Sequence, residues 1–126
     1  MILVSEQKSE YGKMLVNLIK LKGMSQQMFY DKLGIKKTYF YDIISGKANP
    51  PPPIMQLKII DILQPSEIER NSLLEIAATT RKEMPADILI YLRNNSNILD
   101  EIRNSKKYKK FMSKGEKEYV GANKAK

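Results

Sequence analysis

The spacing of apolar residues is the feature of this sequence that most limits its fold. Apolar side chains recur at intervals of three and four residues, which places them on one face of an α-helix. The first such set is Tyr11, Met14, Leu15 and Leu18. The alternation of apolar and polar residues that is typical of strands occurs nowhere in the chain. The sequence therefore predicts an all-α fold.

Capping and turn-forming residues indicate where the first helices begin and end. The first helix is expected to end near Gly23. Ser25 can cap a second helix that runs to Leu33, and Gly34 can form the sharp turn into a third helix, from about residue 36 to 45. The apolar positions expected to be buried in this pair are Phe29, Leu33, Ile35, Phe40, Ile43 and Ile44.

Four consecutive prolines, residues 50–53, follow the third helix. They force an extended backbone and predict a stiff connector, with Pro53 suited to the first position of a fourth helix. A docking peptide for a proline-binding module is the alternative. The fourth helix has two apolar flanks and is expected to be covered on both: Ile54, Leu57, Ile60 and Leu63 on one, Ile59 and Ile62 on the other.

Further short helices are expected after Pro65. Ser66 and Glu69 fit a capping box at the start of a fifth helix. Ser96 can cap a seventh helix. Between them a sixth helix is expected over 87–93, with three residues facing inward: Ile88, Tyr91 and Leu92.

The pattern divides the chain into three regions. Residues 1–64 are expected to form a helical domain, and residues 65–105 a helical extension. Residues 106–126 form a basic tail in which lysine dominates and apolar residues thin out. We expect this tail to be partly disordered, from about residue 113 onward.

Composition narrows the function. The chain contains neither cysteine nor histidine, which excludes disulfides, thiolate metal sites and histidine-dependent catalysis. Lys and Arg number 22 against 14 Asp and Glu, so the net charge of +8 favours a polyanionic partner, nucleic acid before an acidic membrane. No segment approaches the ~20 apolar residues of a membrane span. We expect a cytoplasmic protein that is not an enzyme and binds no metal or cofactor.

The segment 25–45 carries the functional signal. Its third helix is held by an apolar face, and the opposite face begins with Lys36, Lys37 and Thr38 and continues through Tyr41 and Asp42. A short helix with a basic start and a polar outer face fits the major groove of DNA, which is ~12 Å wide.

The residues 24–35, MSQQMFYDKLGI, and 42–50, DIISGKANP, resemble the helix-turn-helix of the XRE family, the relatives of phage repressor and Cro proteins. The resemblance implies a lambda-repressor-like helical bundle with a C-terminal helical extension. It also implies a sequence-specific DNA-binding transcriptional regulator, a repressor of phage or mobile-element type.

The resemblance assigns DNA contacts along these two helices. Lys37, Thr38 and Asp42 fall where side chains reach base edges. Phosphate and backbone contacts are implied for the start of the second helix and the flanks of the third. The full set is Ser25, Gln26, Lys36, Lys37, Thr38, Tyr39, Tyr41, Asp42 and Lys47. Base stacking by Tyr39 and Tyr41 on single strands or RNA is the alternative for those two aromatic residues.

Two residues depart from the family pattern. Tyr30 occupies a position where the family prefers a small residue, so we expect either a wider helix crossing or an outward-turned ring. Lys36 replaces the usual Ser or Thr cap, which adds charge near phosphate but loses a cap worth ~1 kcal/mol.

The resemblance implies a homodimer on double-stranded DNA, because a pseudo-palindromic operator is read as two half-sites. The candidate self-association residues are Ile76, Ile88, Leu92, Ile98 and Ile102, which could instead complete an intramolecular core. The alternative function is an antitoxin, or another inhibitor that grips a protein through residues 66–104. A protein anti-repressor or a toxin is then the expected further partner.

Overall fold

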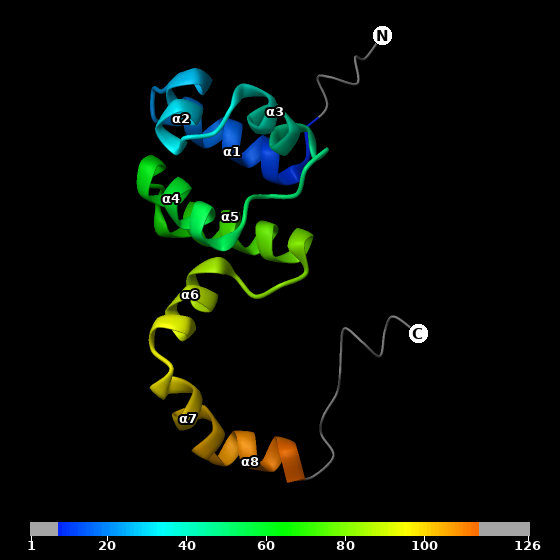
Figure 1. The fold of residues 1–126 in the computed structure, drawn as a ribbon, viewed down its shortest axis with the longest axis vertical. Coiled ribbons are helices and arrows are strands. Elements are labelled where there is room, and N and C mark those ends of the chain that lie inside the picture. The colour runs from blue at the N-terminus through cyan, green and yellow to red at the C-terminus, as the bar shows by residue number, and fades with distance from the viewer. Residues whose placement is uncertain (1–7, 114–126) are drawn as a thin grey trace. The chain divides into compact units, whose positions relative to one another are not determined.

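The computed structural model describes residues 8–113 of the chain, and within them all regular structure is helical (Figure 1). The all-α prediction is confirmed. The eight helices of the described residues are α1 (Glu10–Leu21), α2 (Gln26–Leu33), α3 (Lys37–Ser45), α4 (Pro53–Leu63), α5 (Glu67–Arg81), α6 (Ala86–Asn94), α7 (Asn97–Asn104) and α8 (Lys106–Ser113).

The predicted capping residues fix several of the helix ends. The Ser25 hydroxyl accepts a hydrogen bond from the backbone N–H of Met28 at 3.0 Å, which starts α2. Gly34 ends α2 in the left-handed region at φ 85°, where a side chain would be strained. At the start of α5, Ser66 and Glu69 form both bonds of a capping box. Hydrogen bonding to the Glu69 carboxylate by Ser66, chiefly by its backbone N–H, lowers the pKa of Glu69, because it favours the charged form.

The first compact unit contains the hydrophobic core and extends to Ile90. In this unit α1 lies against α2, α3 and α5, while α2 also packs on α4. Phe29 and Phe40 are fully buried, as predicted, and α5 contributes Leu73 and Ala77 to the same core. The expected boundary at residue 64 therefore falls between two helices that share one core.

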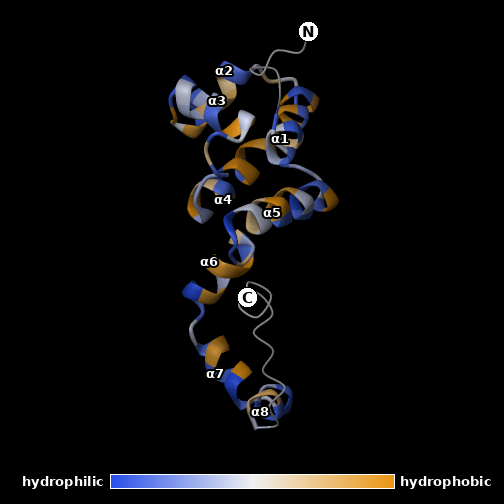
Figure 2. Ribbon diagram, turned by 90° about the vertical axis from the view of Figure 1, so that its right-hand side faces the viewer, coloured by the Kyte–Doolittle hydropathy of each residue, from blue (hydrophilic) through white to orange (hydrophobic). Residues whose placement is uncertain are grey.

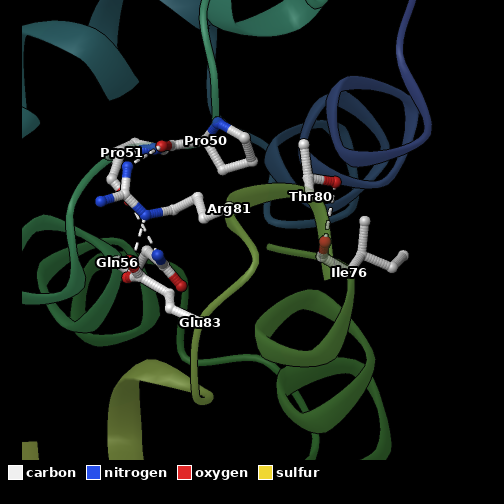
Figure 3. Close-up of polar contacts among 7 residues, drawn as sticks. All are labelled: Pro50, Pro51, Gln56, Ile76, Thr80, Arg81 and Glu83. Carbon is white, nitrogen blue, oxygen red and sulfur yellow. Dashed lines mark hydrogen bonds and ion pairs between the residues drawn. The ribbon is translucent and has the colours of Figure 1, made fainter. Parts of the chain in front are cut away.

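The proline connector is part of this core structure. Pro50 and Pro51 are buried, and both of their carbonyl oxygens accept hydrogen bonds (Figure 3). The Arg81 guanidinium donates to Pro50 at 2.9 Å, and the Gln56 amide donates to Pro51 at 2.8 Å. Arg81 also pairs with Glu83 at 3.0 Å. These bonds support the connector role, because a buried proline cannot dock into an external binding module.

The structure corrects the face assigned to α4. Ile54 was predicted to be covered, but 66% of it is exposed. The buried side of α4 consists of Gln56, Ile59 and Leu63, about half a turn away from Ile54 around the helix. A glutamine can occupy this core position because the Pro51 carbonyl accepts its amide hydrogen bond.

Two predictions about α6 and α7 are also wrong. Ile88 and Tyr91 do not face inward but are exposed, and the buried residue of α6 is Ala86. Ser96 does not cap α7, because its own backbone is already helical and its side chain makes no capping bond.

The second compact unit begins at Tyr91 and contains α7 and α8. The tail expected over 106–126 starts as a helix, α8, and Ser105 caps it by accepting a hydrogen bond from the Tyr108 N–H at 3.2 Å. The disorder expected from about residue 113 falls almost wholly outside the described residues. None of the helices in 8–113 has the length and apolar character that crossing a bilayer requires.

Candidate nucleic-acid interface

Helix α3 presents one apolar face to the core and a polar face to solvent. Phe40, Ile43 and Ile44 are buried, whereas Lys37 and Thr38 at its start are exposed. The outward side therefore begins with polar side chains in the first turn of the helix, at its N-terminus. Unpaired backbone N–H groups at such an end favour anions.

Phe40 holds α3 against the core through contacts with a cluster of aromatic rings. Its ring lies 5.9 Å from that of Phe29, 5.4 Å from that of Tyr30 and 5.3 Å from that of Tyr41, measured between centroids. Tyr30 therefore packs against α3 as part of the half-buried shell around the core, and it does not turn outward. The ring occupies the space between α2 and α3 that a small residue would leave open.

The end of α3 is fastened to the start of α1. The backbone N–H and the hydroxyl of Ser9 both donate to the Ile44 carbonyl, at 3.0 and 3.2 Å. The same hydroxyl accepts from the Gly12 N–H at 2.9 Å. A side chain at Gly12 would collide with the Ile44 backbone, so the helices approach this closely only because the residue is glycine. Sequence reasoning missed both Ser9 and Gly12.

A second hydrogen bond that the sequence did not indicate stabilises the turn between α2 and α3. The Lys58 ammonium of α4 donates to the Leu33 carbonyl at 3.1 Å. This carbonyl lies in the last turn of α2, where a positive charge is favourable. The turn at Gly34 is therefore supported from outside the two helices it joins.

The predicted DNA-contact residues differ in their exposure and in the contacts they make within the chain. The Tyr41 hydroxyl donates to the Gln26 side-chain oxygen at 3.1 Å, which brings the start of α2 together with the middle of α3. Ser25, Lys36, Lys37, Thr38 and Lys47 are exposed, and Asp42 is half-buried. Tyr39 instead packs on the core, so its ring is not held out on the polar face. Lys36 precedes α3 and forms no capping bond.

The lysines of this surface carry uncompensated charge. The ion pairs found in residues 8–113 are Arg70 with Glu67 and Arg81 with Glu83, and neither involves a lysine of this surface. The ammonium groups of Lys36, Lys37 and Lys47 are thus available to an external anion. The same part of the chain contains no cluster of acidic groups able to hold a metal ion.

Tyr11 provides a test of how tightly α1 is packed beneath this surface. Burial raises the pKa of its hydroxyl above the usual value near 10, and Tyr39 raises it further. The unfolded chain therefore loses this proton first.

We expect stability to be unaffected by Tyr11 below about pH 10 and to fall above it, by up to about 1.4 kcal/mol per pH unit. Urea unfolding between about pH 9 and 11.5 measures this slope. Tyr11→Phe removes the contribution, and an unchanged slope would contradict it.

Scans of the chain against protein-family models, curated proteins and solved structures gave no match.

Proposed function

We propose that this protein is a sequence-specific transcriptional regulator that binds double-stranded DNA, and that α2, the Gly34 turn and α3 act as a helix-turn-helix of XRE type. The observation that supports this most is the two-sided character of α3. Its apolar face is fixed in the core, and its start, with Lys36, Lys37 and Thr38, is exposed.

The dimensions and charge of α3 suit the major groove. An α-helix with its side chains is about 10–12 Å in diameter, so α3 can lie in a groove that is ~12 Å wide. The helix presents its N-terminal residues outward, which is the end that contacts base edges in helix-turn-helix proteins. Its lysines meet no acidic partner in the described chain, so phosphate can take that place.

The contacts we propose follow from the chemistry of each side chain. Lys37 donates to O6 and N7 of a guanine, Asp42 accepts from N4 of a cytosine, and Thr38 lies against a thymine methyl group. Lys36 and Lys47 neutralise phosphates. Gln26 contacts a phosphate at the start of α2, and its hydrogen bond from Tyr41 holds the side chain in position.

We further propose that the protein acts as a repressor and binds as a homodimer to a pseudo-palindromic operator. One short recognition helix reads few base pairs, and two half-sites multiply the specificity.

Selection from a pool of random duplexes is the direct test. We expect enrichment of a sequence with two related half-sites, and affinity that falls steeply with salt because the dimer replaces counterions at ~6–10 phosphates. A chain that enriches no sequence and shows no salt-dependent binding would overturn the proposal and favour a protein-interaction role.

Lys37→Ala and Lys47→Ala separate base reading from phosphate binding. Each removes one exposed lysine charge. We expect Lys37→Ala to lose ~1–3 kcal/mol of preference at one base pair, and Lys47→Ala to weaken all sequences alike with a salt slope smaller by about 1. Fluorescence anisotropy on the selected operator and single-base variants measures both. An equal loss on every sequence for Lys37→Ala would make Lys37 a phosphate contact.

A further inference from the structure

Arg81, the last residue of α5, connects this helix to a segment thirty-one positions earlier in the chain. Its guanidinium donates to the Pro50 carbonyl at 2.9 Å and to the Glu83 carboxylate at 3.0 Å (Figure 3). The arginine side chain is only 21% exposed, so both contacts are largely shielded from water. Hydrogen bonds from a charged donor in such surroundings are stronger than those between neutral groups.

Arg81 reaches this segment because it lies on the buried side of α5. The buried residues of the helix include Ala77 and Ala78, which precede Arg81 by four and three residues and so share its face. Figure 2 shows hydrophilic and hydrophobic residues interspersed along α5. An arginine on a core face is costly unless its donors find acceptors, and Pro50 and Glu83 supply two.

The segment that Arg81 holds follows α3 and carries Lys47. In it Lys47 is exposed, Ala48 is half-buried against the core and Pro50 is buried. The Ala48 N–H donates to the Asp42 carbonyl of α3 at 2.9 Å, a bond that fixes the start of the segment to its own helix. The bond from Arg81 fixes its end. Lys47 therefore lies on backbone that is held on one side by α3 and on the other by α5.

We infer that Arg81 is a positioning residue for DNA binding and acts through Lys47. By holding the Pro50 carbonyl, it fixes the backbone from which the Lys47 ammonium reaches a phosphate. Phosphate contacts set the orientation of a protein on the duplex, and a contact on fixed backbone loses less freedom on binding. Helix α5 then belongs with the DNA-binding helices, although it lies beyond the boundary that the sequence predicts at residue 64. The inference rests on the proposed function for its consequence, but the anchoring itself requires no DNA.

Hydrogen exchange of the full chain tests the anchoring in the absence of DNA. Arg81→Met removes both hydrogen bonds and keeps the apolar stem. We expect the Ala48 N–H to exchange ~10-fold faster, because the segment opens more often. The Ile35 N–H, which bonds to Tyr30 at the turn between α2 and α3, should keep its rate. A variant that loosened the whole unit would accelerate both amides, and an unchanged Ala48 rate would overturn the inference.

Two further variants control this experiment. Arg70→Met removes the same charge from the same helix at a side chain that is 41% exposed, and it should leave the Ala48 rate unchanged. Glu83→Gln keeps Arg81 and removes only the charge that orients its guanidinium. We expect it to raise the Ala48 rate by ~3-fold, in the same direction as Arg81→Met.

Salt-dependent binding to the selected operator tests the consequence for DNA. We expect Arg81→Met to weaken binding by ~10-fold, with a salt slope smaller by about 1 and an unchanged preference among bases, as for Lys47→Ala. Arg70→Met matches the loss of charge and should change the affinity by less than about twofold. An Arg81→Met chain that binds as tightly as the wild type would overturn the inference.

A double-mutant cycle shows whether Arg81 acts through Lys47. Adding Arg81→Met to Lys47→Ala should cost less than about twofold more, because the contact that Arg81 positions is already lost. Independent effects would multiply to ~100-fold, and that result would overturn the inference. If the Ala48 amide responds to Arg81→Met as expected but the wild type binds no duplex, the anchoring is supported and the DNA-binding proposal alone fails.

Discussion

Replacing Gly12 with alanine is expected to lower the free energy of unfolding by about 3 kcal/mol or more. The reason is the contact between α1 and α3, where a methyl group at residue 12 would overlap the backbone of Ile44. Backbone atoms cannot rotate away as the end of a side chain can, so α3 must move. Native proteins are stable by only ~5–15 kcal/mol, so this loss is a large fraction of the total.

Helix propensity alone predicts the opposite result. Alanine stabilises a helix interior over glycine by up to about 1 kcal/mol. Asn17→Ala, at an exposed position of the same helix, is the matched control and should be neutral or slightly stabilising. Urea unfolding monitored by circular dichroism measures both variants. A Gly12→Ala protein as stable as the wild type would show that α3 is not held this closely.

Phe40→Ala is expected to cost about 3–5 kcal/mol, because it leaves a cavity where one fully buried ring touches three others. The loss falls on the helix that carries the candidate DNA-binding residues. We therefore expect weaker DNA binding as well as a lower melting temperature.

Tyr41→Ala separates these two effects. Tyr41 is the next residue on the same helix and also an aromatic ring in contact with Phe40, but it is 44% exposed. We expect its removal to cost about 1 kcal/mol or less in stability while freeing Gln26 from its hydrogen bond. Differential scanning calorimetry and anisotropy on the operator measure the two properties. Equal destabilisation by both variants would contradict the central position of Phe40 in the core.

Local signals were sufficient for much of the first unit. Ser25, Gly34 and the pair Ser66 and Glu69 act within one turn of the backbone, so their roles do not depend on distant parts of the chain. The burial of Phe29 and Phe40 likewise follows from helical spacing. Where a helix has apolar residues on several sides, as in α4, spacing does not decide which side faces the core, and Ile54 was assigned wrongly.

In the candidate interface, too, the sequence predicts some features and leaves others undecided. The exposure of Lys37 and Thr38 follows from their place on the polar side of an amphipathic helix. The inward packing of Tyr30 could not be predicted, because a tyrosine between two helices can turn either way until its neighbour is known. The role of Lys58 depends on a carbonyl twenty-five positions earlier in the chain.

The sequence by itself determined the helical class, most helix ends of the first unit and the polar face of α3, because each depends on residues within one or two turns of one another. Only the tertiary structure decided three other properties. The backbone of α3 approaches α1 closely at Gly12, α5 shares the core of the first four helices, and α7 and α8 bury no residue. These properties depend on which surfaces meet, and surfaces meet through contacts between residues far apart in the chain.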